Sequence, residues 1–181
     1  MQHPLETGNA KGSARLLQMS LSGSQLVIGE AFAEQELQAL LYAPFRREQT
    51  HRMQPVLLYP ELPQEHATHA SGHAAFDKAI FPDPARIRLI VLDGTWRKSR
   101  KMLYLNPLLQ RLPRLPLSNM PASQYTIRKA HGADQLSTLE AACYALMQLE
   151  GSDAKYQPLL AAFKGFVAQQ AGYASRADPA E

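Results

Sequence analysis

The segment "IRLIVLDGTW" (87–96) constrains the fold more than any other part of the chain. Its apolar, β-branched run predicts a buried strand, which ends at Asp93 and Gly94. Thr95 is a good N-cap and predicts a helix that begins near Trp96. A strand that passes directly into a helix is the building unit of α/β folds.

The same alternation continues along the chain. We expect strands at 25–32, 54–63, 111–117 and 124–129, and helices at 33–45, 136–151 and 156–173. In the second of these helices, Ser137 and Glu140 form a capping box and Gly151 ends the helix. The pattern predicts an α/β fold with a mostly parallel sheet flanked by helices. Ligands of such folds gather at the carboxyl ends of the strands, where Asp93, Gly94 and Thr95 lie.

The length of 181 residues suits one domain. Residues 1–14 are polar, contain two glycines and lack periodicity, so we expect a flexible leader there. A single domain is then expected over 15–173, followed by a frayed tail over 174–181. No segment has the length of a membrane span or the pattern of a signal peptide, which predicts a cytoplasmic protein without membrane contact.

Basic residues cluster directly after Trp96. The run consists of Arg97, Lys98, Arg100 and Lys101, without interleaved acids, and Ser99, Met102 and Leu103 are expected to face inward. A solvated face is the usual explanation of such a run. The excess continues at Arg111, Arg114, Arg128 and Lys129, however, and the sequence pI is about 9.1. Phosphate contact is therefore the better interpretation.

No metal site is expected. His66, His69 and His73 have spacings that one helical face could present to zinc, but no HExxH arrangement accompanies them, and a polar loop is the better interpretation. Cys143 is the only cysteine, which excludes an internal disulfide and a cysteine-rich zinc site. Its position within a helix predicts a core residue.

Four ordered segments resemble the DTW-domain family. "LDGTW" (92–96) matches the family's Asp-x-Thr-Trp signature, and "PVLLYP" (55–60) precedes it. "SQYTIRK" (123–129) and "LSTLEAACYAL" (136–146) follow, so the resemblance runs from about Leu26 to Leu149.

The resemblance implies a tRNA-uridine aminocarboxypropyltransferase. Such an enzyme transfers the 3-amino-3-carboxypropyl group from S-adenosylmethionine to N3 of a uridine in tRNA, leaving methylthioadenosine. It also implies a SPOUT-like fold with a knot on the C-terminal side, S-adenosylmethionine as co-substrate, tRNA as partner and no metal. Both a monomer and a homodimer are compatible with it. The alternatives are an S-adenosylmethionine-dependent RNA methyltransferase and a non-catalytic RNA-binding module.

Many bacterial members of the family carry a cysteine-rich N-terminal segment, whereas residues 1–14 contain no cysteine. If that segment grips RNA in those members, this chain must use another surface.

The resemblance also implies roles for particular residues. Asp93, Thr95 and Trp96 are the expected catalytic residues, with Asp93 acting as a base or as the partner of the transferred amino group. Trp96 would wall the methionine portion or stack on a flipped base. The expected S-adenosylmethionine contacts are Leu58, Tyr59, Pro60, Leu92, Gly94 and Leu117. The expected RNA contacts are Arg97, Lys98, Arg100, Lys101, Tyr125 and Arg128.

Two of these assignments have equally good structural explanations. Tyr125 is either a stacking residue or a half-buried strand tyrosine. Ser137, Thr138 and Glu140 either lie near the S-adenosylmethionine site or serve only as the start of a core helix.

Overall fold

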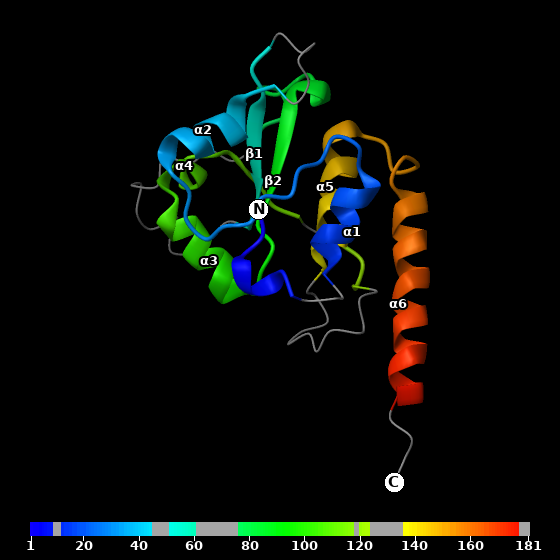
Figure 1. Ribbon diagram of the computed structural model, residues 1–181. Coiled ribbons are helices and arrows are strands. Elements are labelled where there is room, and N and C mark those ends of the chain that lie inside the picture. Colours follow the sequence, from blue (N-terminus) through cyan, green and yellow to red (C-terminus); the bar gives the residue numbers. More distant parts are fainter. Residues whose placement is uncertain (9–11, 45–50, 61–75, 118–119, 124–135, 178–181) are drawn as a thin grey trace. The chain divides into compact units, whose positions relative to one another are not determined.

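The computed structural model describes residues 1–8, 12–44, 51–60, 76–117, 120–123 and 136–177, as the ribbon in Figure 1 shows. The chain divides into two compact units, Met1–Leu117 and Ser118–Glu181. Among the described residues, the first unit contains the sheet and the second contains two helices.

The sheet of the first unit has three parallel strands. They are β1 (Gln54–Leu58), β2 (Ile87–Val91) and β3 (Arg114–Leu115), in the order β2-β1-β3. Val56 of β1 lies opposite Leu89 of β2. The continuous apolar run of β1 is buried along its middle, as expected for a central strand covered on both faces.

Helices flank this sheet. The first unit contains α1 (Ser13–Ser20), α2 (Glu34–Tyr42), α3 (Trp96–Leu105) and α4 (Pro107–Gln110), together with two short 3-10 turns, Pro4–Glu6 and Pro84–Arg86. Figure 1 shows α2, α3 and α4 on one side of β1 and β2. Their apolar faces meet in a buried cluster made of Leu37, Leu41, Leu57, Tyr59, Ile90, Leu103, Leu109 and Leu112. The prediction of a mixed α/β fold with a parallel sheet flanked by helices is confirmed.

The beginning of the chain differs from the expected flexible leader. Gln2 and His3 are buried, and Gln2 pairs in parallel with both Ile28 and Asp93. The next residues form a 3-10 turn, and α1 begins at Ser13. The leader was expected because these residues are polar, whereas their burial depends on backbone hydrogen bonds to distant segments.

The strand expected at 25–32 is reduced to the bridge at Ile28.

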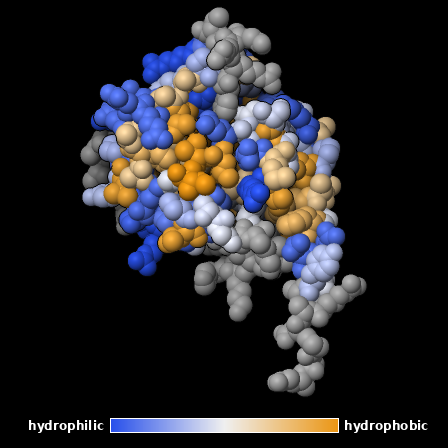
Figure 2. All heavy atoms as spheres, in the orientation of Figure 1, coloured by the Kyte–Doolittle hydropathy of each residue, from blue (hydrophilic) through white to orange (hydrophobic). Residues whose placement is uncertain are grey.

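Figure 2 shows apolar residues (orange) interrupting a largely hydrophilic surface. The exposed large hydrophobic side chains of the first unit include Leu5, Ile28 and Trp96.

The second unit contains α5 (Thr138–Glu150) and α6 (Gln157–Ala177). The start and end of α5 are as predicted, because Ser137 and Glu140 form the capping box and Gly151 adopts a left-handed conformation with φ 66°. Cys143 is fully buried, as expected. Since α6 continues to Ala177, the first residues of the expected frayed tail are helical. No helix within the described residues is long and apolar enough to cross a membrane.

Candidate active site

The junction between β2 and α3 has the predicted local geometry. Thr95 has extended backbone angles, and its side chain accepts a hydrogen bond from the backbone N–H of Lys98 at 3.4 Å. This N-cap starts α3 at Trp96. Gly94 fits here because a Cβ at this position would lie 3.2 Å from the Cβ of Lys98. The chain thus turns sharply enough to leave Asp93 at the carboxyl end of the sheet.

Asp93 is buried and is held by the N-terminal segment. Only 8% of it is exposed, and Nε2 of Gln2 donates to its Oδ2 at 2.9 Å. The backbone N–H of Asp93 donates to the carbonyl of Met1 at 2.8 Å, and its own carbonyl accepts from His3 N–H at 3.0 Å. Residues some ninety positions apart in sequence therefore fix both the backbone and the carboxylate of Asp93.

An aromatic pair lies at the same edge of the sheet. The rings of Tyr59, just after β1, and Trp96 meet edge to face, with centroids 5.8 Å apart. Tyr59 is buried, whereas Trp96 is 50% exposed, so its indole presents an open surface beside the strand ends. The structure thus brings together Trp96 and Tyr59, which the sequence assigned to catalysis and to S-adenosylmethionine binding.

Arg114 supports this aromatic pair from β3. Its guanidinium lies over the Tyr59 ring at 5.6 Å, and Nη1 donates to the carbonyl of Pro60 at 3.4 Å. Arg114 is completely buried, which corrects its inclusion among the cations expected to meet phosphate. Its role in the folded chain is to hold the exit of β1.

The cations of α3 divide into two groups. Lys98 pairs with Glu6 at 2.8 Å, and Lys101 pairs with Glu30 at 2.9 Å. Arg97 and Arg100 are exposed, and neither forms an ion pair with another residue that the structure describes. Ser99, Met102 and Leu103 are buried, as predicted for the inward face of the helix. In Figure 1 the dark-blue N-terminal turn lies beside α3, in agreement with the Lys98–Glu6 pair.

Glu30 connects Lys101 to His3. The Nε2 atom of His3 lies 2.7 Å from Oε1 of Glu30, while Nδ1 accepts a hydrogen bond from the backbone N–H of Leu5 at 3.2 Å. Because Nδ1 accepts, the ring proton is on Nε2 and is donated to Glu30. The hydrogen bond from Lys101, followed by that from His3, lowers the pKa of Glu30. This polar chain fastens the N-terminal segment to α3.

The second unit holds the remaining predicted carboxylate, Glu140. Its Oε2 accepts from the backbone N–H of Ser137 at 2.8 Å and from the hydroxyl of Ser123 at 2.7 Å. The backbone N–H of Glu140 donates to the Ser137 hydroxyl at 3.2 Å, which completes the capping box. The role of Ser137 and Glu140 as the start of a core helix is thus observed directly, and Thr138 is the first residue of that helix.

The other predicted residues lie either at the carboxyl ends of the three parallel strands or outside the described residues. Leu58 and Pro60 lie at the end of β1, Leu92 and Gly94 follow β2, and Leu117 lies just after β3. Tyr125, Arg128, Lys129 and the three histidines at 66, 69 and 73 lie outside the described residues. Within the described residues, no group of three or more His, Cys, Asp or Glu side chains has a metal-binding arrangement.

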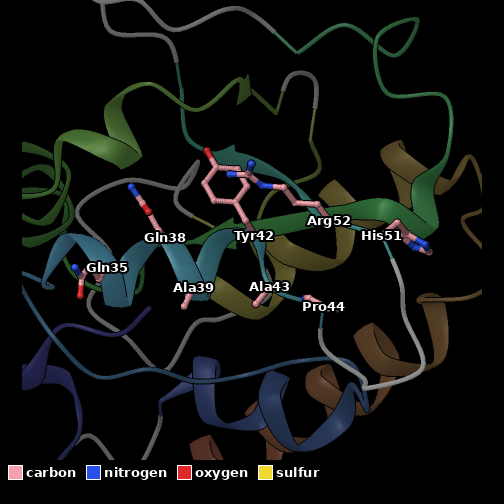
Figure 3. Close-up of a pocket in the computed structure, with 8 residues that line it drawn as sticks. All are labelled: Gln35, Gln38, Ala39, Tyr42, Ala43, Pro44, His51 and Arg52. Atoms are coloured by element: carbon pink, nitrogen blue, oxygen red, sulfur yellow. The ribbon is translucent and has the colours of Figure 1, made fainter.

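A shallow hollow of about 520 Å³ lies at the opposite edge of the sheet. Figure 3 shows its lining at the end of α2 and before β1, where the guanidinium of Arg52 lies over the Tyr42 ring at 4.0 Å. His51 and Pro44 complete this rim. None of the predicted site residues lines the hollow, so it is separate from the group around Asp93.

Sequence reasoning missed Gln2, His3 and Glu30. Their side chains are polar, and no hydrophobic periodicity marks the N-terminal segment as part of a sheet. A signal of moderate value was available in Glu30, an acid placed directly after a strand-like run, at the kind of position where sheets present functional groups.

The local geometry is that of an α/β protein with a ligand site at the strand ends. A carboxylate, a capped helix start and an exposed indole lie together at the carboxyl ends of parallel strands, the place where α/β proteins bind their ligands. The sequence model of the DTW domain matches residues 1–171. The chain therefore belongs to the DTW domain family.

The chain is also similar to curated proteins. It is 29% identical over 169 residues to "tRNA-uridine aminocarboxypropyltransferase 2" of Drosophila melanogaster, an alignment that covers 88% of this chain and 59% of the fly protein. The proteins of that name from Macaca fascicularis and Mus musculus are each 29% identical over 164 residues, covering 88% of this chain and 50% of their own length. The chain thus spans about half the length of these relatives. No solved structure matches it.

Proposed function

We propose that this protein transfers the 3-amino-3-carboxypropyl group from S-adenosylmethionine to N3 of a uridine in tRNA and releases methylthioadenosine. The observation that carries the proposal is the buried Asp93 at the start of α3, beside the half-exposed Trp96, in a chain of the DTW domain family. The names of the relatives support the same reaction class.

The residues at the strand ends suit S-adenosylmethionine as co-substrate. The amino acid portion carries an ammonium group, for which Asp93 is a partner of opposite charge, and a carboxylate, which the N–H groups at the start of α3 favour. The Tyr59–Trp96 pair supplies an apolar wall. The backbone beside Leu58, Pro60 and Leu117 supplies hydrogen-bonding groups for adenosine.

The sulfonium of S-adenosylmethionine activates the carbon to be transferred. In the reaction, a bond forms between uridine N3 and that carbon while the carbon–sulfur bond breaks, and its electron pair stays on the sulfur of methylthioadenosine. The N3 proton must leave, and Asp93 is our choice to accept it, or else to hold the amino group of the transferred chain. Orientation of the two reactants accounts for much of such catalysis, about 7–11 kcal/mol in favourable cases.

For the RNA, we propose contact through Arg97 and Arg100, which are exposed on α3. Lys98 and Lys101 are paired with Glu6 and Glu30 and would contribute after exchanging these partners. Tyr125 and Arg128 stay predictions of RNA contact. The single catalytic domain over 15–173, the SPOUT-like knot, the cytoplasmic location and the choice between monomer and homodimer also stay predictions.

The decisive experiment is mass spectrometry of nucleosides from tRNA that lacks the modification, after incubation with the purified protein and S-adenosylmethionine. We expect an aminocarboxypropyl-uridine together with an equal amount of methylthioadenosine. A methylated nucleoside with S-adenosylhomocysteine would instead identify an RNA methyltransferase. RNA binding without any product would identify a non-catalytic module.

A further inference from the structure

The backbone of Gln2 is held by pairing on both of its sides, to Ile28 and to Asp93. Its backbone N–H donates to the carbonyl of Val27 at 2.8 Å, and its carbonyl accepts from the N–H of Gly29 at 3.0 Å. On the other side, Met1 and His3 exchange backbone hydrogen bonds with Asp93. The direction in which the Gln2 side chain leaves the backbone is therefore fixed by these pairings.

The Gln2 side chain reaches the carboxylate of Asp93. The two atoms, Nε2 of Gln2 and Oδ2 of Asp93, are 2.9 Å apart, and only 4% of Gln2 is exposed. An ionised carboxylate can only accept hydrogen bonds, so the amide atom facing it is the NH₂ group. Such a bond to a carboxylate restricts its rotation and so fixes its orientation.

The contact is not needed for the start of α3. Thr95 already caps that helix, and the backbone bonds of the N-terminal segment would form with any residue except proline at position 2. What the glutamine adds is a specific donor to the carboxylate of Asp93. Removing one member of such a buried pair leaves the other without its hydrogen bond, which destabilises the folded protein.

We propose that Gln2 is the positioning residue for Asp93 and holds its carboxylate in the orientation that faces the substrates. The proposal rests on the proposed function, in which Asp93 touches the uridine or the transferred amino group. Gln2 itself touches neither, so its effect is on the chemical step rather than on the affinity for S-adenosylmethionine.

Two replacements separate positioning from packing. Gln2→Met has nearly the same shape but no donor, and Gln2→Glu replaces the donor with a second carboxylate. We expect kcat at pH 8 to fall about ten- to hundredfold in Gln2→Met, since small misplacement of a reacting group costs this much, with KM for S-adenosylmethionine unchanged. Gln2→Glu should fall further because two close carboxylates oppose each other's ionisation.

Thr7→Ala is the matched control. Its hydroxyl donates to the carbonyl of Pro4 at 2.8 Å in the same segment, without contact to Asp93. This variant should keep the kcat of the unmodified protein. A loss of kcat in Thr7→Ala equal to that in Gln2→Met would assign the effect to general loosening of the segment and overturn the proposal.

A second measurement does not depend on activity. The side-chain NH₂ of Gln2, observed by ¹⁵N NMR, should show a downfield proton that is slow to exchange. Asp93→Ala should move it to the ordinary position, whereas Thr7→Ala should not. If the Gln2 resonance is the same in Asp93→Ala, or if Gln2→Met keeps full kcat in a protein that transfers the group, positioning by Gln2 is refuted. If the unmodified protein shows this resonance but transfers nothing, the proposed function fails instead, and the positioning role falls with it.

Discussion

The N-termini of α3 and α5 have the same two features, an N-cap hydroxyl and a buried carboxylate, in different arrangements. Each helix has a hydroxyl N-cap, Thr95 or Ser137, and each has a buried carboxylate nearby. In α5 the carboxylate of Glu140, 2% exposed, is part of the cap itself. In α3 the carboxylate lies before the cap, at Asp93, and is held by Gln2.

The first turns differ in charge as well. Glu140 lies in the first turn of α5, where a helix favours negative charge. The first turn of α3 has no acid and contains Arg97 and Lys98, which oppose the helix dipole. The N-terminus of α5 follows every local preference of a helix, so stability explains its residues. The N-terminus of α3 places cations where a helix disfavours them, and such a departure is expected at a functional site. Burial alone does not distinguish the two carboxylates.

The largest effect should come from Asp93→Asn. We expect transfer to fall about 10²- to 10⁴-fold, the usual contribution of a positioned acid or base. Calorimetry with S-adenosylmethionine separates the two roles, since a base would leave the Kd unchanged and an amino-group partner would weaken it. Glu140→Gln is the matched control and should change transfer little. Equal losses of transfer activity in both variants would contradict the proposal that Asp93 is catalytic and Glu140 is structural.

The reverse pattern is expected for stability. Glu140→Ala removes the acceptor for the Ser137 N–H and the Ser123 hydroxyl, and a buried unsatisfied group costs about 1–3 kcal/mol. Urea unfolding should show this loss in the free energy of unfolding, with transfer by the folded protein retained. Asp93→Asn keeps an acceptor oxygen for Gln2 and should be less destabilising. A stability unchanged by Glu140→Ala would show that the capping box contributes nothing.

The charge difference between the helix starts predicts a smaller effect on RNA affinity. Replacing Arg97 and Arg100 by Gln should weaken tRNA binding and reduce the slope of log K against log salt by about one per lost phosphate contact. Lys155→Gln is the matched control, because it removes a cation that is paired with Glu150. Filter-binding titrations at several salt concentrations measure both. An unchanged slope would show that Arg97 and Arg100 do not contact phosphate in the complex.

The smallest effect concerns the neighbour of Glu140. Burial, and next the charge of Glu140, raises the pKa of the Cys143 thiol to about 11. At pH 8 the thiol is therefore protonated, and alkylation by iodoacetamide should be much slower than for free cysteine. Glu140→Gln removes part of this shift, so the reaction should accelerate a few-fold, as followed by mass spectrometry. Rapid alkylation of the unmodified protein would contradict the buried, uncharged thiol.

The local parts of this structure were predictable from sequence. Both N-caps, the Gly151 terminus and the inward face of α3 depend on residues within a few positions of one another. Strand β2 likewise followed from its own apolar run. These features need no information about distant segments.

The interactions that complete the site were not predictable in this way. Hydropathy places Gln2 and Arg114 outside, whereas hydrogen bonds and ring contacts to distant residues place them inside. Polar burial is decided by partners, and a single sequence does not state which partners meet. For the same reason, the sequence suggested more free surface cations than the structure has, because Arg114 is buried and Lys98 and Lys101 are paired with acids.

The pairing of Gln2 with Asp93 also has a consequence for how the protein is made. The two residues are 91 positions apart, and Ile28 lies on the other side of Gln2. During synthesis the segment Met1–His3 therefore leaves the ribosome long before its partner exists, and closing so long a loop is slow and entropically costly. The carboxylate site therefore forms only after β2 and Asp93 have emerged.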